Sequence, residues 1–191
     1  MGKEFELKYA ATAQQLGQLK AHYPHLQPIS METTYYDNIA GDFSRLKWTF
    51  RRRMENGRSV CTLKTPLGGH GRAEFEVECG CIKDAVALFL EQGAPKELPA
   101  LAEKGIVQSC GAQFTRLAGN LEIPGATVEL ALDEGVLLGG GKELPFQEVE
   151  VELKDGSESA ATAFAEALAA EYGLNPESRS KVARAQQLAQ K

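Results

Sequence analysis

The sequence predicts an α+β fold: a closed, roughly eight-stranded antiparallel β-barrel with a few helices packed outside it. Two observations lead to this prediction. First, about eight segments alternate apolar and polar side chains with the period of two typical of a strand, and short connections favour antiparallel pairing. Second, several strands carry charges at successive alternate positions, and such a face inside a barrel is stable only in a wet lumen that holds ions or a polyanion.

Length and composition indicate a single domain over residues 1–191. The chain has 191 residues, of which 43% are hydrophobic, and this is enough for one sizeable core. The net charge of -5 argues against a general nucleic-acid surface, because such surfaces normally carry a basic excess. Any basic cluster in this chain is therefore local.

The sequence also indicates the compartment. No run approaches the roughly 18 apolar residues of a membrane span, and charged residues stand where a signal peptide would be apolar. We therefore expect a cytoplasmic protein with no membrane partner. The four cysteines are unevenly spaced, and without a secretion signal we expect reduced thiols.

The first strand, expected over residues 3–9, places Glu4, Glu6 and Lys8 on one face. Glutamates at alternate positions lie about 7 Å apart, so both carboxylates can reach one divalent cation, with the lysine one step further along. This arrangement suits a metal-bound anion. The alternative interpretation is an exposed edge strand with protective charges.

A second acidic strand lies near the other end of the sequence. Residues 147–154 carry Glu148, Glu150 and Glu152 on one face, with apolar residues on the other. On a buried face these carboxylates repel one another unless cations neutralise them, whereas on an exposed face they only add solubility. Two acidic strands that meet across a closed sheet favour a metal site.

A basic hairpin is expected over residues 47–65, with an Asn-Gly turn between its strands. Arg51 and Arg53 share one face of its first strand, and Arg52 points to the other. Lys64 adds a cation from the second strand. Guanidinium groups bind phosphate oxygens in planar, bidentate fashion, so this face predicts a phosphate site. The alternative is a solvated arginine face, which is less consistent with an acidic protein.

Further charged residues recur on the strands between these segments. Residues 72–78 alternate strictly, and strands expected over residues 107–117 and 127–132 add one charge each. A turn at 133–135 is expected to follow, leading into a short strand. The cations added by these strands are Arg72 and Arg116, and the added interior carboxylates are Glu74, Glu76, Glu129 and Asp133.

Helices are expected over residues 12–23, 83–92 and 157–172, from their apolar periodicity and capping residues. Segment 94–105 contains two prolines and several charges, and it is expected to be a surface excursion.

Two smaller motifs lie toward the C-terminal end. The glycines at 139–141 lack the Lys-Ser/Thr that follows the glycines of a phosphate-binding loop, so a hairpin connection is the favoured interpretation. Lys181 and Arg184 are spaced by one helical turn, which brings both cations to one side of the chain.

Several short segments occur in a fixed order along nearly the whole chain. They are Glu4-x-Glu6-x-Lys8, Tyr35-Tyr36-Asp37, Arg51-x-Arg53, Thr62-Leu63-Lys64, Arg72-x-Glu74-x-Glu76 and Ser180-Lys181-x-x-Arg184. In this order they resemble the CYTH superfamily, the triphosphate tunnel metalloenzymes. Each segment alone is short, and the ordered set is specific. Phe50 departs from the family pattern conservatively, because leucine is usual at its position.

The resemblance implies a metal-dependent hydrolase with one linear triphosphate in its tunnel and Mg²⁺ or Mn²⁺ as cofactor. The implied metal ligands are Glu4, Glu6, Glu148, Glu150 and Glu152. The implied phosphate-binding residues are Lys8, Arg51, Arg53, Lys64, Arg72, Arg116, Lys181 and Arg184. Lys8 and Tyr35 are the candidates for direct participation in catalysis. Strand parity does not separate Tyr35 from Tyr36.

Inorganic triphosphate is the favoured substrate, and two related activities remain open. In a class IV adenylate cyclase the 3′-hydroxyl of ATP replaces water, and in a thiamine triphosphatase an organic group occupies one mouth of the tunnel. From another class, a module could bind polyphosphate or a nucleotide without turnover, although the many carboxylates argue against this. The expected partner is a small polyanionic substrate, and the protein is expected to be a monomer or a homodimer.

Overall fold

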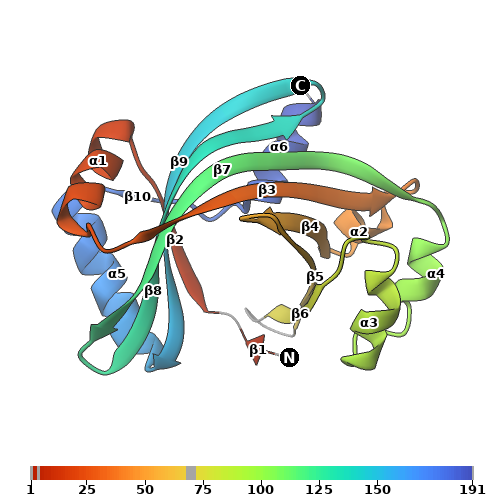
Figure 1. Ribbon diagram of the computed structural model, residues 1–191, viewed down its shortest axis with the longest axis horizontal. Coiled ribbons are helices and arrows are strands. Elements are labelled where there is room, and N and C mark those ends of the chain that lie inside the picture. Colours follow the sequence, from red (N-terminus) through yellow and green to blue (C-terminus); the bar gives the residue numbers. More distant parts are fainter. Residues whose placement is uncertain (1, 4, 68–71, 191) are drawn as a thin grey trace.

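The computed structural model describes residues 2–3, 5–67 and 72–190, which form one large antiparallel sheet and a few helices (Figure 1). The strands are β1 (Gly2–Lys3), β2 (Glu6–Ala10), β3 (Gln27–Asn38), β4 (Thr49–Glu55), β5 (Arg58–Pro66), β6 (Arg72–Glu78), β7 (Ile106–Ile123), β8 (Ala126–Gly139), β9 (Lys142–Gly156) and β10 (Asn175–Pro176). Their order across the sheet is β1-β6-β5-β4-β3-β7-β8-β9-β2-β10.

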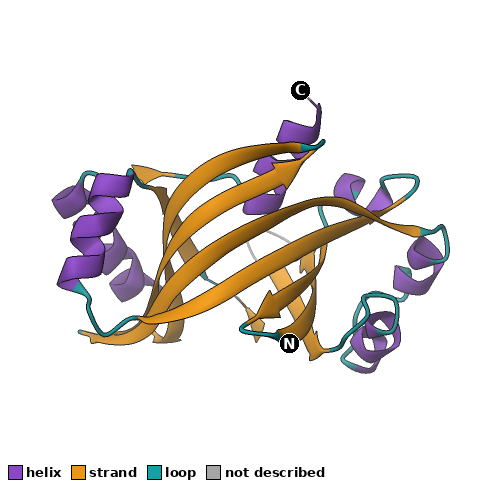
Figure 2. Cartoon of the chain, turned by 45° about the horizontal axis from the view of Figure 1, so that its top comes forward, coloured by secondary structure: helices purple, strands orange, loops and turns teal. Residues whose placement is uncertain are grey.

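The sheet is not closed, so the expectation of a closed eight-stranded barrel is wrong. It has 10 strands, and in the described residues its edge strands β1 and β10 do not pair with each other. The physical reason lies in the alternating N-terminal stretch, which does not form one strand. Gly2–Lys3 pairs with β6 at one edge of the sheet, and Glu6–Ala10 pairs with β9 near the other edge. The sheet is strongly curved (Figure 2).

Strand β8 also differs from the expectation, because residues 133–135 are not a turn. They lie inside one continuous strand that pairs with β7 and β9 along its length. A Cβ added at Gly135 would lie 2.1 Å from the carbonyl oxygen of Gln113, so the glycine allows the neighbouring backbone to approach closely. A composition typical of a turn thus marks a place where two paired strands approach each other closely.

The helices cover both faces of the curved sheet (Figure 1). They are α1 (Ala13–His22), α2 (Asp42–Arg45), α3 (Ala85–Glu91), α4 (Leu98–Ala102), α5 (Glu158–Tyr172) and α6 (Lys181–Gln190). The expected helices 12–23, 83–92 and 157–172 correspond to α1, α3 and α5. The capping box of Thr12 and Gln15 begins α1, and Gly173 in the left-handed conformation ends α5.

Two apolar clusters pack these helices on the outer face. Leu16 and Leu19 of α1 and Leu168 of α5 join the outward residues of β2, β8 and β9. Helices α3 and α4 cover the outward side of β4, β5 and β6, with Phe89 and Leu98 fully buried. Helix α4 lies within segment 94–105, so the expectation of a mere surface excursion is wrong there. Its proline lies in the first helical turn, where proline is tolerated.

Helix α6 packs on the concave side of the sheet. Ala185 lies in a cluster with Met31, Phe114 and Phe146, which belong to β3, β7 and β9. At the β8–β9 turn, a Cβ added to Gly139 would lie 2.2 Å from the carbonyl oxygen of Ala185. The glycines at 139–141 therefore form a hairpin connection, as expected, and they let the helix backbone approach.

The remaining expectations about the chain's chemistry concern thiols and membranes. Cys61, Cys79, Cys81 and Cys110 are all free thiols. Within the described ranges, no helix combines the length and the apolar character needed to cross a lipid bilayer.

Candidate functional site

A cavity of about 760 Å³ opens on the concave side of the sheet. Its wall is made by inward-facing side chains of β2 to β9, together with the start of α6. Most of the charged residues expected at the site contribute to it. The charged lining residues are Glu6, Lys8, Arg51, Arg53, Glu55, Lys64, Arg72, Glu74, Glu76, Arg116, Glu129, Glu150, Glu152, Lys154 and Lys181.

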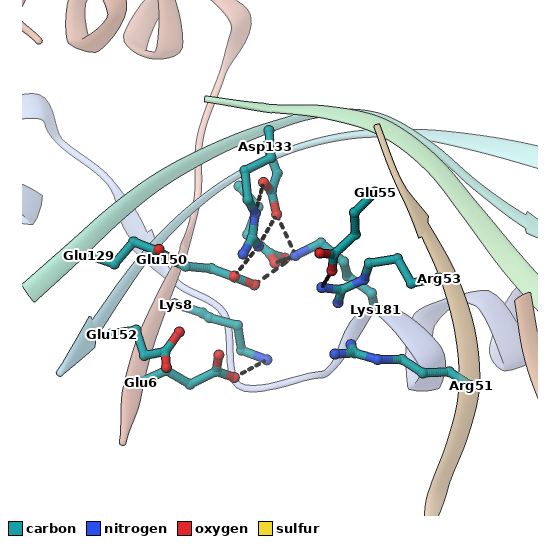
Figure 3. A network of polar contacts seen from close by, with 12 residues as sticks. Glu6, Lys8, Arg51, Arg53, Glu55, Glu129, Asp133, Glu150, Glu152 and Lys181 are labelled. Carbon is teal, nitrogen blue, oxygen red and sulfur yellow. Dashed lines mark hydrogen bonds and ion pairs between the residues drawn. The ribbon is translucent and has the colours of Figure 1, made fainter. Parts of the chain in front are cut away.

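One wall carries a row of carboxylates on three neighbouring strands. Glu152 of β9 is the register partner of Glu6 on β2 and of Glu129 on β8. Directly opposed residues on antiparallel strands have Cβ atoms about 4.5–5.5 Å apart, so these carboxylates can share one cation. We call Glu6, Glu129 and Glu152 the carboxylate row. Figure 3 shows it facing Arg51 and Arg53 across the cavity.

Lys8 lies next to the carboxylate row on β2. Its ammonium is 3.6 Å from a carboxylate oxygen of Glu6, and its register partner on β9 is Glu150. The side chain lines the cavity and is largely buried. The alternation along the first strand therefore holds for Glu6 and Lys8. Glu4, the third residue of that motif, lies outside the described residues.

Deeper in the sheet, the ammonium of Lys181 lies among three carboxylates. It is 2.8 Å from Asp133 Oδ2 and 2.7 Å from Glu150 Oε1, and it also contacts Glu148. The oxygens of these carboxylates lie within 4.8 Å of one another, which is a spacing that a metal ion could use. Here the lysine from the first turn of α6 occupies that position.

Two arginines complete this buried network. Arg116 donates to both oxygens of Asp133 at 2.8 Å and also contacts Glu150. Arg184 contacts Glu148. The three carboxylates are thus matched by three cations, and the network anchors α6 to β7, β8 and β9. Asp133, Glu148 and Arg184 lie behind the cavity wall rather than on it.

The buried network shifts the pKa values of its members. Burial raises the pKa of Glu148 to about 7, against the opposing charge of Lys181. Burial would also raise the pKa of Glu150, but Lys181 and Arg116 outweigh it and hold that pKa well below its usual range. For Lys181, burial would lower the pKa, and the charges of Glu150 and Asp133 outweigh it and raise the pKa. The charges of Glu150 and Asp133 likewise outweigh burial at Arg116 and raise its pKa, so Lys181 and Arg116 stay charged near neutral pH.

The opposite wall is cationic. The side chains of Arg51 and Arg53 on β4 are 11% and 14% exposed, and Lys64 of β5 is buried beside them. Arg51 lies 4.0 Å and Lys64 lies 3.3 Å from the same carboxylate oxygen of Glu74. Arg51 and Lys64 thus share the carboxylate of Glu74 on this wall.

The two arginines of this wall have unused donor capacity. The Nε atoms of both Arg51 and Arg53 are buried, and no described group hydrogen-bonds to either. Burial lowers the pKa of Arg53, and the nearby charges of Arg51 and Arg116 lower it further. Buried donors without partners are unfavourable, as are crowded like charges, and a bound anion relieves both costs. Arg52 points to the outer face, where it donates to the carbonyl oxygen of Gly80 at 3.2 Å.

Tyr35 and Tyr36 point to opposite faces of β3. Tyr35 lines the cavity and is the register partner of Arg51. Tyr36 contacts Phe50 in the outer core, with ring centroids 6.4 Å apart. The choice left open by the sequence is therefore resolved in favour of Tyr35.

Two charged cavity residues, Glu55 and Lys154, were not among those expected from the sequence. Glu55 follows Arg51 and Arg53 at alternate positions of β4, and it lies 3.1 Å from Arg53. Lys154 follows Glu152 at the same spacing on β9, 3.0 Å from its carboxylate. The parity that predicted their neighbours was sufficient to find both.

The pKa of Lys154 is raised, which favours its charged form. Burial would lower its pKa, but the hydrogen bond and the charge of Glu152 outweigh burial and raise the pKa. It also lies 3.7 Å from Glu129, so this ammonium contacts two members of the carboxylate row.

Sequence comparison matches this chain to a known protein family. The family model for the CYTH domain matches residues 2–185. The chain belongs to the CYTH family. An inorganic triphosphatase of Haemophilus influenzae is 29% identical over 194 aligned positions, which cover 96% of this chain and 54% of the relative. This chain thus spans about half the length of that curated relative.

Solved structures with the same fold include two named for adenylate cyclases. A putative adenylate cyclase from Bacillus halodurans has a TM-score of 0.68 at 19% identity, covering 96% of this chain and 98% of the other. A putative adenylyl cyclase from Hippeastrum, described as having a dominant triphosphatase activity, has a TM-score of 0.68 at 18% identity, covering 96% and 95%. At these identities the likeness establishes the CYTH fold alone.

Proposed function

We propose that this chain is a metal-dependent hydrolase of inorganic triphosphate. One observation carries the proposal: a row of carboxylates and a wall of incompletely paired arginines face each other across a single cavity (Figure 3). A metal-bound polyanion matches both surfaces at once. The CYTH family and the inorganic triphosphatase of Haemophilus influenzae support the same assignment.

The carboxylate row is the proposed site for Mg²⁺ or Mn²⁺. Its donor set consists of carboxylate oxygens, which are hard ligands suited to these ions. Glu4 is proposed as a further ligand because it alternates with Glu6. Glu150 lines the cavity beside the row and is also held by Lys181 and Arg116. Glu148 is held by Lys181 and Arg184 behind the cavity wall, so we assign Glu148 to the anchoring of α6. When bound, the metal would neutralise phosphate charge and polarise the phosphoryl oxygens.

The cationic wall is the proposed binding surface for the triphosphate. Arg51 and Arg53 present guanidinium donors that phosphate oxygens would accept from, and Lys64 and Arg72 add charge along the same wall. As water attacks the terminal phosphorus in line, the bond to the bridging oxygen breaks and charge spreads over the transferred oxygens. The arginines are positioned to stabilise that charge because they are held in place before the reaction.

Lys8 and Tyr35 are the proposed participants nearest the reacting atoms. Lys8 lies between the carboxylate row and the cationic wall, so its ammonium can neutralise a phosphate oxygen close to the metal. A role as the base that takes a proton from water is the competing assignment. We favour phosphate binding, because the ammonium lines the cavity beside Glu6 of the carboxylate row. The hydroxyl of Tyr35 would donate a hydrogen bond to the same substrate.

A substrate panel tests the proposal. Inorganic triphosphate, ATP, thiamine triphosphate and pyrophosphate are incubated with Mg²⁺ or Mn²⁺, and phosphate and cyclic nucleotide are assayed separately. We expect phosphate release to be fastest from inorganic triphosphate and to depend on the metal. Cyclic AMP from ATP would identify a class IV cyclase instead, and preferential cleavage of thiamine triphosphate would identify a thiamine triphosphatase. Tight binding without release of any product would identify a non-catalytic module.

A further inference from the structure

Lys154 occupies an unusual position on β9. Its neighbours Leu153 and Asp155 pair with Val128 and Thr127, which are consecutive residues on β8, so Lys154 is the extra residue of a β-bulge. The bulge leaves Lys154 without a register partner on β8, and its ammonium lines the cavity. The ammonium lies 3.0 Å from Glu152 and 3.7 Å from Glu129.

The position of this ammonium is the one a divalent cation would need. Glu129 and Glu152 are register partners, and Lys154 contacts one oxygen of each. An ammonium and a metal ion therefore compete for the same oxygens. A divalent cation in place of Lys154 would bring two positive charges to these carboxylates, whereas the ammonium brings one.

Comparison with Lys181 shows which ammonium can leave. The side chain of Lys181 is 9% exposed, and three carboxylates hold it. With Arg116 and Arg184, it matches the three negative charges of those carboxylates. The side chain of Lys154 is 35% exposed, and two carboxylates, Glu129 and Glu152, hold it. The flexible lysine stem can swing toward open cavity without uncovering a buried charge.

We propose that Lys154 is a tethered competitor of the divalent cation: it neutralises Glu129 and Glu152 while the metal is absent and is displaced when the metal binds. This inference rests on the proposed metal site. Displacement moves the ammonium away from the carboxylates, so metal binding would also release a cation that can contact a phosphate oxygen. Metal-free protein is meanwhile protected from repulsion between two adjacent carboxylates.

Mn²⁺ binding without any triphosphate tests this role. Titrations followed by electron paramagnetic resonance compare the wild type with Lys154→Gln, Lys154→Arg and Lys20→Gln. Lys20 is the matched control, because its side chain is 37% exposed and pairs with Glu134 at 2.6 Å, away from the cavity lining. We expect Lys154→Gln to bind Mn²⁺ roughly three- to tenfold more tightly than both the wild type and Lys20→Gln. Lys154→Arg, which keeps the competing charge, should not bind more tightly. Unchanged or weaker binding by Lys154→Gln would overturn the inference.

Thermal unfolding provides a second readout. In chelator, Lys154→Gln should melt at a lower temperature than Lys20→Gln, and its gain on adding Mn²⁺ should be larger. Glu152→Gln separates the two proposals. If Glu152→Gln abolishes Mn²⁺ binding and Lys154→Gln leaves the affinity unchanged, only the competitor role fails. If no variant binds Mn²⁺, the metal site fails and the competitor role fails with it.

Discussion

Glu6 on β2 and Glu152 on β9 are direct cross-strand partners, so carboxylates from opposite ends of the sequence stand side by side in the cavity wall. The contact follows from the strand order, in which β2 lies directly beside β9. A divalent cation at this place would join strands that are distant in sequence. The chemistry of the site is therefore built by the sheet topology rather than by any one loop.

The cationic wall gives a prediction that separates the two faces of β4. Arg51→Ala and Arg53→Ala should each remove a charge-assisted contact worth about 1.5–3 kcal/mol, which weakens triphosphate binding roughly 10- to 150-fold. Arg52→Ala is the control, since Arg52 contacts Gly80 on the outer face. Affinity is measured by calorimetry, and turnover by phosphate release. Equal losses at all three positions would mean that the face of the strand does not matter.

Lys8 is tested by a substitution that keeps its charge. Arginine cannot act as a base near neutral pH, so Lys8→Arg should retain most of the turnover if the ammonium only binds phosphate. Steady-state kinetics give the turnover number, and calorimetry gives the affinity for triphosphate. Loss of turnover with the affinity intact would favour the proton-accepting role over phosphate binding.

Lys181 should matter for stability more than any exposed lysine. Lys181→Met leaves Asp133, Glu148 and Glu150 without their shared ammonium, and breaking a buried ionic network costs about 3–5 kcal/mol. Lys20→Met removes an exposed pair with Glu134 and should cost less than about 1 kcal/mol. Urea denaturation measures both free energies of unfolding. Similar small losses would show that the network does not anchor α6.

The cysteines should divide into two classes of reactivity. Burial raises the pKa of Cys61 to about 12 and that of Cys110 to about 11, so almost no thiolate forms at pH 8 at either position. Cys79 and Cys81 are partly exposed. We expect a thiol reagent at pH 8 to modify Cys79 and Cys81 in the native protein well before the other two. Mass spectrometry of the labelled peptides identifies the modified residues, and rapid labelling of Cys61 would contradict the burial.

Strand parity predicted much of this site because it reports which side chains share a face. It separated Arg51 and Arg53 from Arg52, and it grouped Glu150 with Glu152. Parity does not report depth along a strand. Glu148 shares the face of Glu152 but is buried against α6, whereas Glu150 both lines the cavity and holds Lys181, and only the packing of that helix determines this difference.

The sequence also could not show how the sheet ends. The N-terminal stretch alternates throughout, and its division between partners on opposite sides depends on the curvature of the other strands. Gly135 was equally ambiguous, because turns and close strand crossings both select glycine. In each case long-range packing determined the outcome, and local composition does not contain that information.

Metal binding by the carboxylate row is tested most directly by substitutions that remove its charges. Glu6→Gln and Glu152→Gln preserve shape while removing one proposed metal ligand each, and Glu78→Gln is a control on the exposed pair with Arg58. Phosphate release from inorganic triphosphate is measured across a Mn²⁺ titration. We expect both row variants to lose at least about 100-fold in turnover at saturating metal, and the control to keep it. Turnover within a few-fold of the wild type in both row variants would contradict the metal assignment.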